Sequence, residues 1–106
     1  MKVVDYLPIG SVVVLNGGIQ KLLVISRGIN VNRNGEVLFF DYGGVLYPDG
    51  LTGDQMAYFN HDGIETVVFR GYDDDDSKTL ADNINKYLLK NPKTKRGDPN
   101  VINNQQ

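Results

Sequence analysis

The sequence predicts an α+β fold: a small, bent antiparallel sheet or SH3-like barrel of about five strands, followed by a C-terminal helix. Short β-branched and aromatic runs fill residues 1–70, and such runs are typical of strands. Turns rich in glycine and asparagine separate the runs at hairpin spacing. The one clear stretch with the apolar period of a helix follows the last run. A helix packed on an open antiparallel sheet is the alternative arrangement of the same elements.

Five runs are predicted to form the strands, and they span residues 11–15, 21–27, 36–47, 56–59 and 65–70. Asn16-Gly17-Gly18 and Asn34-Gly35 supply residues that tolerate positive φ, which tight hairpins require. Asn30 to Gly35 as a whole is expected to be turn-like. Gly43-Gly44 interrupts the third run and predicts a bulge or a sharp bend there. Residues 60–64 are predicted to form one capped 3₁₀ turn.

The predicted helix covers about residues 77–90. Its apolar stripe has helical spacing and consists of Leu80, Ala81, Ile84, Tyr87 and Leu88. We expect Leu80, Ile84 and Leu88 to be the buried members. Four aspartates, Asp73 to Asp76, precede the helix, where its dipole favours anions. Asn91-Pro92 ends it, because the residue before a proline disfavours the α conformation.

The chain is predicted to form a single globular domain over residues 1–91, with a flexible basic tail over residues 92–106. The whole chain has 106 residues, which suits one hydrophobic core. The tail carries Lys93, Lys95 and Arg96 against Asp98 and offers little apolar surface to bury.

Composition excludes several classes of function. The chain has no cysteine, which rules out disulfides, zinc ribbons, iron–sulfur sites and thiol catalysis. Its formal net charge of −2 lacks the basic excess of a dedicated nucleic-acid binder. No apolar run approaches the roughly 18 residues of a membrane span. The first residues lack the apolar stretch of a signal peptide, so we expect a cytoplasmic protein with no membrane partner and no cofactor.

Two features resemble a metal site and a catalytic base, but a structural interpretation is favoured for both. Asp73 to Asp76 suggest calcium, yet calcium loops alternate ligands with spacers and end in a glutamate at position twelve. We therefore expect no metal site, only an anionic start to the helix. His61 lies beside Asp62 and near Glu65, and a histidine next to a carboxylate is a typical general base. Nothing marks a nucleophile, so we expect a hydrogen-bonding histidine and no enzymatic activity.

The densest aromatic segment runs from Asp41 to Gly50. Aromatic side chains on a small sheet bind peptides or stack bases, although strand alternation could equally place them in the core. Tyrosine is enriched at binding hot spots, and glycine permits close approach of a second backbone. We therefore expect a protein partner to bind at Tyr42, Gly44, Tyr47 and Tyr58.

Three separated motifs resemble one family: Leu7 to Val13, Asp41 to Gly50, and Phe59 to Ile64 together with Val67 to Tyr72. It is the small domain-of-unknown-function family numbered four-one-seven-six, found in Gram-positive Firmicutes. The likeness covers about residues 6–90 and departs at Gly63, where an acidic residue is expected. Family members are typically encoded in loci of the type VII secretion system, near toxins with an LXG domain. The resemblance supplies no catalytic residue.

The resemblance implies a non-enzymatic accessory protein of that system, which binds a toxin or a secretion component as an adaptor or chaperone. One alternative is an immunity protein that neutralises a co-encoded toxin, because the acidic body of the chain would suit a basic toxin domain. Another is a small barrel that binds nucleic acid. The acidic body argues against it, because phosphate contacts dominate such binding.

Overall fold

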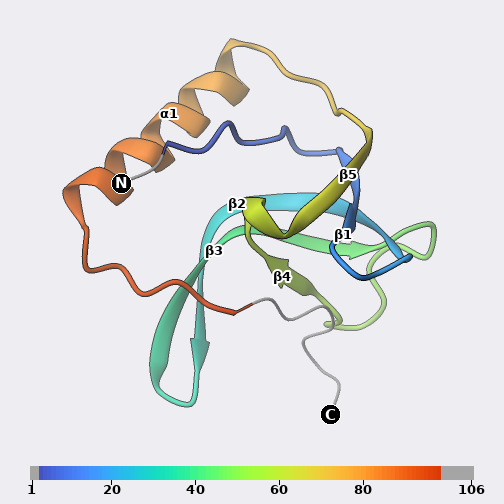
Figure 1. Cartoon of the computed structure of the whole chain (residues 1–106), viewed down its shortest axis with the longest axis horizontal. Helices are drawn as coiled ribbons and strands as arrows, with labels where there is room; N and C mark the ends of the chain where they lie inside the picture. Colours follow the sequence, from blue (N-terminus) through green and yellow to red (C-terminus); the bar gives the residue numbers. More distant parts are fainter. Residues whose placement is uncertain (1–2, 99–106) are drawn as a thin grey trace.

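The computed structural model describes residues 3–98 and shows an open five-stranded antiparallel sheet with one helix after it (Figure 1). The elements are β1 (Val12–Leu15), β2 (Lys21–Arg33), β3 (Glu36–Leu46), β4 (Ala57–Phe59), the 3₁₀ turn η1 (His61–Gly63), β5 (Ile64–Phe69) and α1 (Asp75–Lys90). The strand order is β4-β3-β2-β1-β5, so β4 and β5 are the two ends of the sheet. The predicted α+β class is confirmed, and the sheet is open.

The hairpin of β2 and β3 is longer than the sequence indicates. Asn34 (φ 55°) and Gly35 (φ 81°) alone make its turn, and Arg33 pairs with Glu36 on either side of it. A two-residue turn of this kind needs only two positions with positive φ. Residues 30–33, expected to be turn-like, are therefore free to continue β2.

The bend predicted at Gly43-Gly44 is present. The pairing of β2 with β3 shifts register between Val24 and Ser26, directly opposite these glycines. The strands approach so closely that a Cβ atom at Gly44 would lie 2.8 Å from the carbonyl oxygen of Leu23. A glycine is required at this position because any side chain would separate the two strands.

Helix α1 begins at Asp75, two residues before the predicted start at about residue 77, and ends at Lys90 as predicted. The Asp74 carboxylate accepts a hydrogen bond from the Ser77 backbone N–H at 3.0 Å, which satisfies one of the free amides of the first turn. Ile84 and Leu88 are buried as expected, but Leu80 is 43% exposed. Ala81 packs against the core in its place. The helix is thus rotated slightly about its axis relative to the prediction.

The N-terminal segment runs alongside α1 (Figure 1). The Asn85 side chain accepts from the Val4 N–H at 3.0 Å and donates to the Val4 carbonyl at 2.9 Å. Tyr6 and Leu7 follow and are buried in the core. On β2, Gly28 (φ 60°) contacts Ile84, and a Cβ atom there would lie 2.8 Å from the Ile84 Cδ1 atom. The helix therefore rests on both the N-terminal segment and the middle of β2.

Part of the expected flexible tail is packed on the sheet, which corrects the boundary at residue 91. The Phe39 N–H donates to the Lys95 carbonyl at 2.8 Å, and the Gly97 N–H donates to the Phe39 carbonyl at 2.9 Å. These bonds form because β4 pairs only with Tyr42–Gly44 and leaves the edge of β3 open at Phe39. Residues 99–106, the rest of the expected tail, lie outside the described residues. Between residues 3 and 98, no helix has the length and apolar character to cross a membrane.

Candidate functional site

Two of the four predicted binding residues lie in the core. Tyr42 is fully buried, and its ring stacks on Phe59 with centroids 5.4 Å apart. Its hydroxyl accepts a hydrogen bond from the Leu7 N–H at 2.9 Å. Gly44 is buried against Leu23 and Phe59. The expectation of a partner surface at Tyr42 and Gly44 is corrected, because both positions are covered by the chain itself.

The other two predicted residues reach the surface at different places. Tyr58 is half-buried, with its ring 5.6 Å from that of Phe40 and the Arg33 guanidinium 5.9 Å from its centroid. Tyr47 is 44% exposed and borders a groove that Tyr58 does not line. The structure therefore does not bring the four residues into one surface.

The groove at Tyr47 lies on the sheet face opposite the core. We call it the outer groove; it encloses about 460 Å³ and is lined by Gly10, Val12, Lys21, Leu23, Tyr47, Val68 and Phe69. Val12 pairs with both Leu23 and Phe69, which places these three side chains on one face. Lys21 is the only charged residue in this lining. The outer groove is thus an apolar depression with one cation at its margin.

Strand β5 forms one wall of the outer groove and is also an end of the sheet. It pairs with β1 on one side, and no other strand in residues 3–98 pairs with its second side. Val68 is 48% exposed and Phe69 is 60% exposed. An exposed edge strand presents free backbone groups to which a further strand can bind. Sequence reasoning did not single out β5 as a candidate binding element, although the apolar run Val67-Val68-Phe69 is visible in the sequence.

A second site surrounds Asp41, whose side chain is only 2% exposed. Its Oδ1 atom accepts from the Tyr6 hydroxyl at 2.8 Å and from Arg96 Nη2 at 2.7 Å. Its Oδ2 atom accepts from the His61 backbone N–H at 2.8 Å. Burial, and then the hydrogen bond to Asp41, raise the pKa of the Tyr6 hydroxyl. The three hydrogen bonds pair both oxygens of the Asp41 carboxylate in the interior.

His61 takes part in the same network through its ring. Its Nδ1 atom lies 2.7 Å from the Tyr42 hydroxyl. Burial raises the pKa of Tyr42 to about 12. Its hydroxyl donates to Nδ1 in the histidine tautomer that leaves this nitrogen without a proton. The geometry gives His61 the hydrogen-bonding position that the sequence favours. A charged residue within the aromatic run Phe39-Phe40-Asp41-Tyr42 was the signal for this buried network.

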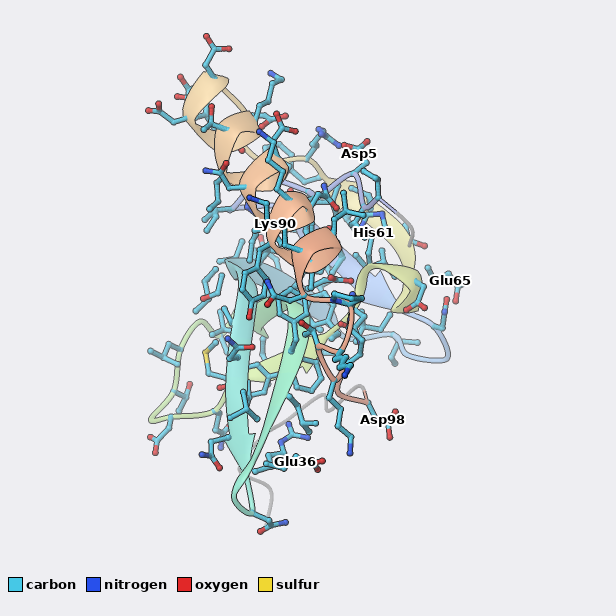
Figure 2. All side chains as sticks on the ribbon, turned by 90° about the vertical axis from the view of Figure 1, so that its left-hand side faces the viewer. Asp5, Glu36, His61, Glu65, Lys90 and Asp98 are labelled. Carbon is cyan, nitrogen blue, oxygen red and sulfur yellow. The ribbon has the colours of Figure 1, made fainter. Side chains whose placement is uncertain are left out.

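The Asp41 network forms the floor of a cleft of about 450 Å³. Its lining consists of Val3, Val4, Asp5, Asp41, Asn60, His61, Asp62 and Arg96. Asp5 and Asp62 are exposed around it. Figure 2 shows Asp5 and His61 on the same side of the molecule, beside α1. The cleft therefore combines the ion pair of buried Asp41 and partly exposed Arg96 with exposed carboxylates.

The four aspartates act locally at the start of α1. Asp74 caps the helix, while Asp75 and Asp76 lie in its first turn. A hydrogen bond from Ser77, followed by contact with Arg70, lowers the pKa of Asp73. Over residues 3–98, no group of three or more histidine, aspartate or glutamate side chains is placed to hold a metal ion.

No curated protein and no solved structure matches the chain. The family described as Domain of unknown function (DUF4176) matches residues 6–80. That range contains all five strands, η1 and the first turns of α1. The chain therefore belongs to this family of domains of unknown function.

Proposed function

We propose that the protein is a non-enzymatic accessory protein that binds a protein partner through the outer groove and the free side of β5. The exposed apolar run Val67-Val68-Phe69 on an end strand is the observation that carries the proposal. Natural edge strands are usually protected by charge, proline or a covering segment. This run has neither charge nor proline, which favours a partner that covers it.

The residues of this surface indicate which side chains the partner segment carries. An extended chain would form backbone hydrogen bonds to β5 and direct alternate side chains toward the outer groove. The lining beside Tyr47 is apolar except for Lys21. We therefore propose a segment with an apolar side chain for the groove and a carboxylate for Lys21.

The family resemblance supports a partner from a type VII secretion locus, either a toxin with an LXG domain or a secretion component. In this role the protein acts in the cytoplasm as an adaptor or chaperone before secretion. A chaperone of this kind needs a surface that pairs with extended segments, as the free side of β5 would.

A second candidate function is an immunity protein. The exposed carboxylates of Asp5 and Asp62, beside the Asp41 cleft, favour contact with a basic toxin domain. Such a protein would protect cells from the toxin domain alone, whereas an adaptor that binds the N-terminal domain of the toxin would not.

The test is affinity capture from the native host with the wild-type chain, Val68→Ser and the control Val37→Ser. Val37 is an exposed apolar strand residue outside the outer groove, so its substitution matches the change in side chain. We expect Val68→Ser to lose a mass-spectrometrically identified secretion-locus protein that Val37→Ser retains. Circular dichroism checks that both variants fold.

Recovery of no secretion-locus protein by the wild-type chain would contradict the proposed system. Equal recovery by both variants would contradict the proposed surface. Co-expression with the toxin domain alone then separates the two candidate roles, since only an immunity protein restores growth.

A further inference from the structure

The open edge of β3 is occupied by a short piece of the chain's own C-terminal region. Residues 95–97, which we call the strap, lie parallel to β3 and form a bridge centred on Phe39 and Arg96. Two backbone hydrogen bonds of 2.8 and 2.9 Å hold the bridge. The strap comes from a region that is far from β3 in sequence, so this edge accepts an added segment.

The contacts of the strap select particular side chains. Arg96 donates to the buried Asp41 carboxylate at 2.7 Å, and its guanidinium carbon lies 5.0 Å from the centroid of Phe39. A planar guanidinium satisfies both contacts at once, which a lysine ammonium does less well. This position therefore favours arginine over lysine.

The next position requires a residue without a side chain. A Cβ atom at Gly97 would lie 2.2 Å from Cζ of Phe40. The Asn60 side chain donates to the Gly97 carbonyl at 2.9 Å and so fixes the backbone there. Together the two positions define a site for arginine followed by glycine in an extended segment.

Other contacts of the strap are weaker. Lys95 pairs with Glu36 on the surface, where both side chains are at least half exposed, and such exposed pairs contribute little. An empty site, by contrast, would leave the carboxylate of Asp41 and the amide of Asn60 without these partners in the interior. The site thus favours occupation by a segment of this chemistry, whichever chain supplies it.

We propose that the edge of β3 beside Asp41 is a recognition site for an extended basic segment of a partner protein in which arginine precedes glycine, with the strap as its competitor in cis. Glu36, Asp5 and Asp62 lie around the site and complement a basic segment. The site shares no residue with the outer groove. A negative result for this recognition site would therefore leave the proposed function at the outer groove intact.

The test uses the full chain and a fluorescent peptide that copies residues 92–98. Gly97→Ala introduces the Cβ that would collide with Phe40 and so expels the strap while leaving the site intact. Because a cis competitor lowers the fraction of open sites, we expect Gly97→Ala to bind the peptide about tenfold or more tightly than the wild-type chain. A peptide with alanine in place of its arginine is expected not to bind.

Lys95→Ala is the matched control. It removes one positive charge from the strap, but from an exposed pair, so peptide affinity should stay within about twofold of wild type. Amide exchange gives an independent measure. The backbone amides of Phe39 and of residue 97 donate the two hydrogen bonds of the bridge. Both should lose protection from exchange in Gly97→Ala and keep it in Lys95→Ala.

Three results would overturn the proposal. One is the absence of peptide binding to every variant although Gly97→Ala has lost amide protection. Another is equal binding to wild type, Lys95→Ala and Gly97→Ala. The third is a wild-type dimer that Gly97→Ala abolishes, which would assign the site to the strap of a second copy. Should Gly97→Ala fail to fold, Arg96→Lys, which retains a cation at Asp41, takes its place with the same expected direction.

Discussion

Tyr42 and Tyr47 are neighbours in the aromatic segment of the chain, yet the sheet places them on surfaces with different roles. Tyr42 lies beneath the N-terminal segment, with its hydroxyl bonded to Leu7 and His61. Tyr47 follows the end of β3 and borders the outer groove. The Tyr42 ring is part of the hydrophobic core, whereas the Tyr47 ring is 44% exposed. The position of each tyrosine in the sheet, and not its residue type, therefore decides which ring is accessible to a partner.

The sharpest test of this difference replaces each tyrosine by serine. Tyr42→Ser removes a buried ring and leaves the Leu7 N–H and the His61 ring without a partner, so we expect a loss of about 3–5 kcal/mol in unfolding free energy. Tyr47→Ser should change it by about 0.5 kcal/mol or less and should reduce capture of the partner. Urea unfolding followed by circular dichroism measures both, and equal losses of stability would refute the distinction.

A second pair of substitutions tests the two sides of α1. Ile84→Ala removes a buried side chain that packs on Gly28, and we expect a cost of about 2–5 kcal/mol. In a domain of this size, that lowers the melting temperature by about 8 °C or more. Leu80→Ala, on the exposed side, should cost less than about 1 kcal/mol. A change within error for Ile84→Ala would mean that α1 is not docked on the sheet.

High pH should weaken the inner face selectively. The pKa of Tyr42 is about 12 in the folded chain, against about 10 for an unfolded tyrosine. Between these values the unfolded chain releases a proton that the folded chain retains, so stability falls as pH rises from 10 to 12. Melting curves across this range should show a steeper decline for the wild-type chain than for Tyr42→Phe. Parallel declines would place the titrating group elsewhere.

The smallest expected effects lie at the start of α1. Asp74→Ala removes the cap on the Ser77 amide and should cost about 1 kcal/mol, while Asp76→Ala should cost only a few tenths of a kcal/mol. Thermal unfolding distinguishes the two. Calorimetric titration with calcium should reveal no site tighter than about millimolar, and a saturable micromolar isotherm would contradict the local role of these aspartates.

Elements determined by neighbouring residues were predictable from the sequence. Asn34-Gly35 specifies its turn whatever surrounds it, and Asp74 caps α1 through an amide three residues away. The rotation of α1 was not predictable in this way, because Leu80 and Ala81 both belong to the apolar stripe. Only the position of the helix over the sheet decides which of them is buried.

The candidate sites also depend on packing that the local sequence does not specify. Residues 39–45 of β3 are buried on both faces of the strand, so they show no polar–apolar alternation that would have assigned Tyr42 and Gly44 to the core. The strap has a polar sequence typical of a mobile tail, and it packs through contacts with residues far along the chain, namely Phe39, Asp41 and Asn60. Partnerships between residues so distant leave no local pattern to detect.

The pair of hydrogen bonds between Val4 and Asn85 has a consequence for biosynthesis. These residues are 81 positions apart, so all of the chain between them must be synthesised before they can meet. At about 5–20 residues per second, the first segment waits several seconds for its helix. Closing so long a loop is entropically costly and slows folding. During that interval α1 cannot cover Tyr6 and Leu7. The hydrophobic core is therefore complete only after the helix has docked.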